Sequence, residues 1–127
     1  MNTVIIGRST LVGKPLSILL LEKNATVTIT HSKSNNIESI TKNADLLISA
    51  VGKPKLIKRS WVKENSIVID VGINRITEGG ISKLTGDVDY VNVSLACKAI
   101  TPVPGGVGPV TIAMLMANTL KAYKANI

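Results

Sequence analysis

The sequence predicts an α/β protein with a doubly wound parallel sheet and helices on both faces. Short runs of β-branched and other apolar residues alternate with segments of helical periodicity, which is typical of parallel strands joined by covering helices. The 127 residues have the length of one compact domain with a single core. We therefore expect residues 1–127 to form one domain without internal repeats, low-complexity tracts or linkers.

The first half of the chain predicts the order β-α-β-α-β. Strands are expected at Thr3–Ile6, Thr26–Thr30 and Asp45–Ala50, and helices at Lys14–Lys23 and Asn36–Lys42. The first of these helices is rich in leucine and isoleucine, so we expect it to be buried over much of its surface. Asn24 should close it, because asparagine tolerates the left-handed conformation that often ends a helix.

The middle of the chain is less regular. Val51–Pro54 breaks the pattern, Ser60 is expected to cap a short helical turn, and Ser66–Val71 predicts a fourth strand. Between Ile73 and Ala96 no regular element is predicted, and Gly79-Gly80 indicates a turn.

The last third predicts a strand, a rigid loop and a helix. Ala99–Thr101 is a short strand candidate, and the prolines and glycines of Pro102–Pro109 indicate a loop that no helix or strand could absorb. Val110–Tyr123 predicts the closing helix. Its apolar residues fall on one stripe, formed by Ile112, Leu115, Met116, Leu120 and Tyr123 together with Thr119.

Composition excludes several classes of protein. No apolar run approaches the roughly 20 residues needed to cross a bilayer, and Met1–Gly7 carries no secretory signal, so we expect a cytoplasmic protein with no membrane partner. Cys97 is the only cysteine, which excludes an intrachain disulfide, a cysteine-based zinc site and a paired redox motif. We expect Cys97 to be a buried apolar residue and assign no metal ligands.

The net charge of +7 has three interpretations: a nucleic-acid surface, a site for an anionic small ligand, or a solvated lysine surface, which is the commonest. Nucleic acid is disfavoured, because single-strand binders stack bases on aromatic side chains and this chain has only Trp61, Tyr90 and Tyr123.

The turn between the first strand and the first helix has the composition of a phosphate-binding loop. Gly7 allows a tight turn, Ser9 adds a hydroxyl, Gly13 permits close packing, and Pro15 fits the first helical turn. The common G-x-G-x-x-G pattern is not met, because Ser9 and Val12 stand where its second and third glycines would be. The turn predicts a Rossmann-like dinucleotide site, and the alternative is a plain β-α turn whose glycines serve geometry alone.

The end of the second strand favours NADP over NAD. NAD-specific folds place Asp or Glu there to hold the ribose hydroxyls, whereas this chain has His31, Ser32 and Lys33. With no carboxylate to repel a ribose phosphate, Arg8, Ser32 and Lys33 could bind one. The alternative is that these are ordinary loop residues.

Three motifs give the chain its resemblance to a known family. The segment GRSTLVGKP from Gly7, the HSK of His31–Lys33 and the loop TPVPGGVGPVT of Thr101–Thr111 are similar, in order and spacing, to the signatures of the methylenetetrahydrofolate dehydrogenase/cyclohydrolase family. Further segments similar to the family are ADLLISAVGKP at Ala44–Pro54, VIDVGIN at Val68–Asn74 and GDV at Gly86–Val88. The resemblance covers nearly the whole chain and matches the family's cofactor domain.

The resemblance implies oxidation of methylenetetrahydrofolate by hydride transfer to NADP, followed by hydrolysis of the methenyl product to formyltetrahydrofolate. It implies that Gly7, Arg8 and Ser9 hold the cofactor phosphates, Ser32 with Arg8 the ribose phosphate, and that Ile73 lies against the nicotinamide end. It also implies that Pro104, Gly105 and Gly106 border the folate cleft. An isoleucine after a strand is more often part of a core.

The family's catalytic lysine, carried on a tyrosine-to-lysine motif in a preceding folate domain, has no counterpart here. Neither Tyr90 nor Tyr123 stands in that context. We therefore assign no catalytic residue, and expect the chain alone to bind cofactor without catalysis, with folate bound only together with the catalytic domain. A homodimer is a further expectation. The alternatives are a non-catalytic nucleotide-binding or interaction module, and a basic nucleic-acid binder.

Overall fold

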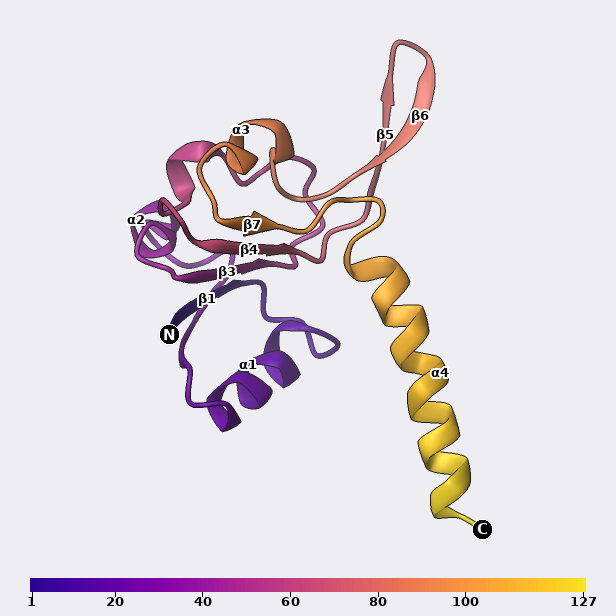
Figure 1. Cartoon of the computed structure of the whole chain (residues 1–127). Coiled ribbons are helices and arrows are strands. Elements are labelled where there is room, and N and C mark those ends of the chain that lie inside the picture. Colours follow the sequence, from indigo (N-terminus) through magenta and orange to yellow (C-terminus); the bar gives the residue numbers. More distant parts are fainter.

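A five-stranded parallel sheet lies at the centre of the computed structural model, which describes every residue from Met1 to Ile127 (Figure 1). The strand order is β2-β1-β3-β4-β7. The strands are β1 (Asn2–Ile6), β2 (Thr26–Thr30), β3 (Leu46–Ser49), β4 (Ile67–Asp70) and β7 (Ala99–Ile100). The register pairs Ile6 with both Thr30 and Ser49, and Ser49 with Asp70. The carboxyl ends of β1 to β4 are therefore level, and the loops that follow them leave from one edge of the sheet.

Helices cover both faces of this sheet. Helix α1 (Gly13–Glu22) lies on one face, where Leu16 and Leu20 pack against the cluster containing Ile5 and Ile48. The opposite face carries α2 (Ile37–Thr41), the 3₁₀ helix η1 (Arg59–Trp61) and α3 (Tyr90–Ser94) (Figure 1). Successive strand residues point to opposite faces. The predicted doubly wound architecture is confirmed.

A β-hairpin replaces the irregular segment that the sequence predicted. Strands β5 (Asn74–Glu78) and β6 (Ile81–Thr85) pair in antiparallel fashion and project from the body of the fold (Figure 1). The turn at Gly79-Gly80 was predicted correctly, whereas the two strands were missed. Neither strand has a buried residue, so the alternation of apolar and polar residues that a half-buried strand shows is missing.

Helix α4 (Val107–Ala125) begins earlier than predicted and extends away from the sheet (Figure 1). The expectation that no helix could absorb Pro102–Pro109 is wrong for its last three residues. Pro109 stands in the first helical turn, where the backbone N–H that proline lacks would have no intrahelical acceptor. No residue of α4 is buried, so its apolar stripe is exposed. None of the helices combines the length and hydropathy of a membrane span.

Three smaller expectations are also wrong. Helix α1 buries only Gly13 and Ser17 and leaves several of its apolar side chains exposed, because only one of its sides meets the sheet. Ser60 lies within η1 rather than at its cap, which is Lys58. Cys97 is half-buried and packs at the margin of the core.

The predicted end of the first helix is confirmed. Asn24 has a φ of 62°, and its N–H donates to the carbonyl oxygen of Leu21 at 2.9 Å.

Candidate functional site

The loop after β1 is tightly packed at both of its glycines. Gly7 has a φ of 124°, and a Cβ atom there would overlap the carbonyl oxygen of Ala50, at the end of β3. A Cβ atom at Gly13 would overlap the carbonyl oxygen of Gly7, which confirms that this glycine permits close packing. The loop backbone therefore folds over the start of α1, and only glycine fits at these two positions.

Backbone N–H groups in this loop are free to bind an anion. The N–H groups of residues 8–11 donate to no acceptor within the chain, and the loop is exposed to solvent. The Oγ atom of Ser9 accepts hydrogen bonds from the N–H groups of Val12 at 3.1 Å and Gly13 at 3.4 Å, which leaves its own proton available. The guanidinium of Arg8 is exposed and forms no ion pair within the chain. Free N–H groups at the start of a helix are a general means of binding phosphate.

The turn after β2 lies beside this loop, because β1 and β2 are neighbours with Ile6 paired to Thr30. The Oγ of Ser34 accepts the N–H of His31 at 3.0 Å, and the Nδ1 of His31 accepts the N–H of Lys33 at 3.2 Å. The side chains of Ser32 and Lys33 are exposed. No hydrogen bond joins Arg8 to Ser32, so the structure places both at the same edge of the sheet without linking them.

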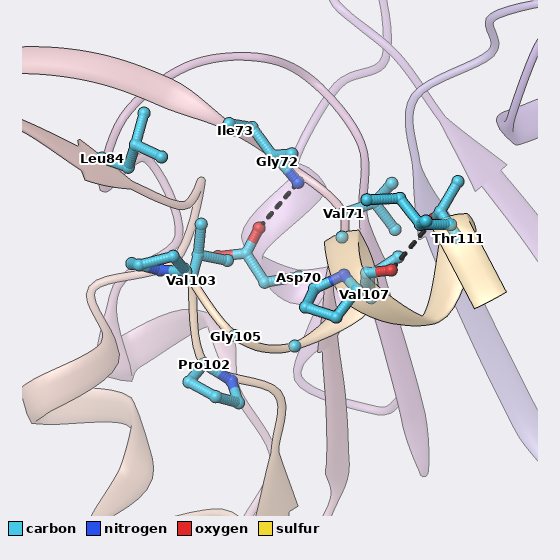
Figure 2. Close-up of a pocket in the computed structure, with 15 residues that line it drawn as sticks. Asp70, Val71, Gly72, Ile73, Leu84, Pro102, Val103, Gly105, Val107 and Thr111 are labelled. Atoms are coloured by element: carbon cyan, nitrogen blue, oxygen red, sulfur yellow. Dashed lines mark hydrogen bonds between the residues drawn. The ribbon is translucent and has the colours of Figure 1, made fainter.

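A cavity of about 460 Å³ lies between the loop after β4 and the start of α4 (Figure 2). It brings Ile73 together with Pro104, Gly105 and Gly106. Gly7, Arg8, Ser9 and Ser32 do not line it. The other lining residues are Asp70, Val71, Gly72, Leu84, Pro102, Val103, Val107, Gly108, Pro109, Thr111 and Ile112.

Asp70 is the one carboxylate of this apolar cavity. Its oxygens accept the N–H groups of Gly72 at 2.9 Å, Asp87 at 3.1 Å and Val88 at 2.9 Å, and Figure 2 shows the first of these bonds. Burial raises the pKa of Asp70 above its ordinary value, and these hydrogen bonds oppose the rise.

Asp87 lies beside Asp70 and is fully buried. Its Oδ2 accepts the Oγ–H of Ser49 at 3.2 Å and the N–H groups of Val51 at 2.8 Å and Gly52 at 3.3 Å. Its Oδ1 accepts the N–H of Lys53 and the Nδ2–H of Asn74, both at 3.0 Å.

Sequence reasoning did not single out these two aspartates. The available signal was an acid placed next to valine and glycine in VIDVGIN and in GDV, where a buried carboxylate requires several hydrogen-bond donors.

Together these features define a dinucleotide-binding α/β domain. Loops at the carboxyl ends of parallel strands provide free N–H groups on one side and an apolar cavity on the other, in the place where such sheets bind ligands. The close-packed glycines of the first loop fit a pyrophosphate, since its backbone is left open to an anion. No three His, Cys, Asp or Glu side chains are grouped to hold a metal ion.

The chain belongs to the family described as tetrahydrofolate dehydrogenase/cyclohydrolase, NAD(P)-binding domain, which it matches over residues 1–127. It is 57% identical over 123 residues to the bifunctional protein FolD of Campylobacter hominis, covering 97% of this chain and 42% of that protein. The FolD of Campylobacter concisus is 55% identical over 127 residues, covering 100% and 44%. The chain thus spans less than half the length of the curated relatives that it matches.

Solved structures show the same fold. The bifunctional FolD of Campylobacter jejuni superimposes with a TM-score of 0.93 at 50% identity, over 98% of this chain and 43% of that one. The methylenetetrahydrofolate dehydrogenase-cyclohydrolase of Trypanosoma brucei, solved with NADP and an inhibitor, gives a TM-score of 0.92 at 38% identity, over 98% and 44%.

Proposed function

We propose that the chain binds NADP as the cofactor domain of a methylenetetrahydrofolate dehydrogenase/cyclohydrolase. The observation that carries the proposal is the loop after β1, in which unpaired N–H groups and the unpaired Arg8 lie beside a β2 turn without a carboxylate. When bound, NADP would accept a hydride from methylenetetrahydrofolate, and the methenyl product would be hydrolysed to formyltetrahydrofolate.

The position of each residue in the fold supports its proposed role. Gly7, Arg8 and Ser9 bind the cofactor phosphates through the loop N–H groups and the serine hydroxyl. Ser32 and Arg8 bind the ribose phosphate, which needs cationic and hydrogen-bonding groups at the end of β2. Ile73 contacts the nicotinamide end, in support of which its side chain is 62% exposed and lines the cavity.

The folate substrate needs a second domain. Pro104, Gly105 and Gly106 provide one wall of its cleft, and no residue of this chain is assigned a catalytic role. The chain alone therefore binds NADP and leaves methylenetetrahydrofolate unchanged. A turnover assay on the purified chain tests this, and sustained formation of NADPH would contradict it.

The proposal extends to location and assembly. A cytoplasmic chain is in keeping with the single cysteine, which allows no intrachain disulfide. A homodimer could form through the β5–β6 hairpin, whose Ile81 is 71% and Leu84 is 40% exposed. Sedimentation across a range of concentrations measures this association.

Titration of the purified chain with NADP and NAD tests cofactor binding directly. Replacing Arg8 by alanine should lower the affinity for NADP by about tenfold or more, the scale of one lost charge-assisted hydrogen bond. The affinity for NAD should fall less. Arg75→Ala is the matched control, because Arg75 is an exposed arginine on the hairpin without an ion pair. Equal losses of affinity for NADP and NAD would show that Arg8 does not bind the ribose phosphate.

A second candidate function is a non-catalytic interaction module. It is favoured by the exposed apolar residues of α4, a helix with no buried residue. Absence of NADP binding in the same titration would contradict the cofactor-binding function and favour the interaction module.

A further inference from the structure

The carboxylate of Asp87 joins segments that are separate in the sequence. Four of its five donors lie at the end of β3 and in the following loop, from Ser49 to Lys53, and the fifth is Asn74 at the start of β5. The backbone of Asp87 is itself held, because its N–H donates to Asp70 and its carbonyl oxygen accepts the N–H of Ile57 at 3.0 Å.

No cation pairs with this carboxylate. Neither Asp87 nor Asp70 takes part in an ion pair, so N–H and O–H donors alone offset the cost of burying Asp87. A buried carboxylate that loses such donors is strongly disfavoured. The three consecutive N–H groups of residues 51–53 must therefore all point at the Asp87 carboxylate, which fixes the path of that loop.

The loop after β4 is fixed against the same group. A Cβ atom at Gly72 would overlap the Asp87 carboxylate, so the backbone passes directly over it. Ile73 follows, and Asn74 then bonds to Asp87. One side chain thus sets the loop after β3 and the loop after β4 relative to each other.

We propose that Asp87 is a positioning residue for the nicotinamide side of the cofactor cleft, acting through Gly72, which packs on its carboxylate, and Asn74, which bonds to it, so that Ile73 between them is held in place. This inference rests on the proposed binding of NADP. Asp87 itself touches no ligand, since it is fully buried.

The phosphate side of the cleft has sheet hydrogen bonds that do not include Asp87. The N–H of Ala50 donates to the carbonyl oxygen of Ile6 at 2.9 Å, and the N–H of Gly7 to that of Thr30 at 2.9 Å, so sheet hydrogen bonds fix the first loop. The β2 turn with Ser32 lies at the sheet edge, separated from β3 by β1. A substitution at Asp87 should therefore weaken binding of the nicotinamide half of NADP and leave binding of the adenosine half unchanged.

Calorimetric titration of Asp87→Asn with NADP and with adenosine 2′,5′-bisphosphate tests this separation. The asparagine amide turns one acceptor into a donor that faces other donors. We expect NADP affinity to fall by about tenfold or more, as for one lost charge-assisted hydrogen bond. Affinity for the bisphosphate, which lacks the nicotinamide half, should stay at the wild-type value. Equal losses for both ligands, or no loss for NADP, would overturn the proposal.

Two further variants keep the test decisive if Asp87→Asn does not fold. Asn74→Ala removes a single donor at a half-buried position and should weaken NADP alone. Asp45→Asn is the control, because Asp45 bonds to Lys63 at the opposite end of β3 and should change stability but neither affinity. If Asn74→Ala binds NADP as wild type does, Asp87 has no positioning role. Failure of the proposed function shows differently, as absence of NADP binding by the wild-type chain.

Discussion

Replacing Gly7 by alanine gives the sharpest test of the loop after β1. Gly7 has a φ of 124°, and a Cβ atom would overlap the carbonyl oxygen of Ala50. Backbone strain costs roughly 1–3 kcal/mol, and overpacking typically costs a similar amount. We expect a loss of about 3 kcal/mol, which for a chain of this length lowers Tm by roughly 10 °C.

Gly79→Ala is the matched control for this substitution. Gly79 has a φ of 58°, and nothing lies within 4 Å of its added Cβ atom, so strain alone costs about 1 kcal/mol. Thermal unfolding followed by circular dichroism compares the two variants. NADP titration of each at a temperature where it is folded should show weaker binding for Gly7→Ala only. If the two variants melt together, or if Gly7→Ala binds NADP as wild type does, the close packing of Gly7 on Ala50 is not what shapes the loop.

Two further predictions concern stability. Lys63 holds the pKa of Asp45 below its ordinary value of 3.8, so this carboxylate stabilises the fold above that pH, and the contribution is lost as pH falls through the lowered pKa. Asp45→Asn should lower Tm at neutral pH and make the acid-induced loss of Tm less steep, and an unchanged acid limb would contradict this. Leu115→Ser on the exposed α4 should change the free energy of unfolding by less than about 0.5 kcal/mol, as usual for surface sites. Leu47→Ala in the core should lower the free energy of unfolding by about 2–5 kcal/mol. Similar urea midpoints for Leu115→Ser and Leu47→Ala would show that α4 is buried in solution.

The strands of the main sheet could be predicted closely from the sequence. The expected strand Thr26–Thr30 matches β2 at both ends. Those at β1 and β7 differ by one residue at one end, and those at β3 and β4 by one residue at each end. Burial on both faces explains this for β1 and β3, which are apolar runs between turn residues. The edge strand β2 is partly exposed, and its β-branched residues indicate a strand.

Elements that bury little could not be found in this way. The hairpin strands have no buried face, and the valines of α3, Val91 and Val93, are spaced two residues apart as in a strand. The sequence predicts a first helical turn at Pro15 and a loop at Pro109, although both prolines stand in the first turn of a helix.

The candidate site was predictable where single residues point to a ligand and not where loops are joined through buried groups. The glycines and Arg8 carry a signal in their own sequence context. Asp87 gains its importance from Asn74 and from residues 49–53, more than 30 positions earlier in the chain, and only the fold brings these together.

The exposed α4 extends about 28 Å, given 19 residues at 1.5 Å each, as a single unbroken rod. Its first two turns carry Pro109, Thr111 and Ile112, which form one side of the cavity. A force applied at the C-terminal end of α4 would rotate the helix about the 102–106 loop that precedes it. The width of the cavity would then be set by forces applied well outside the sheet that supports it.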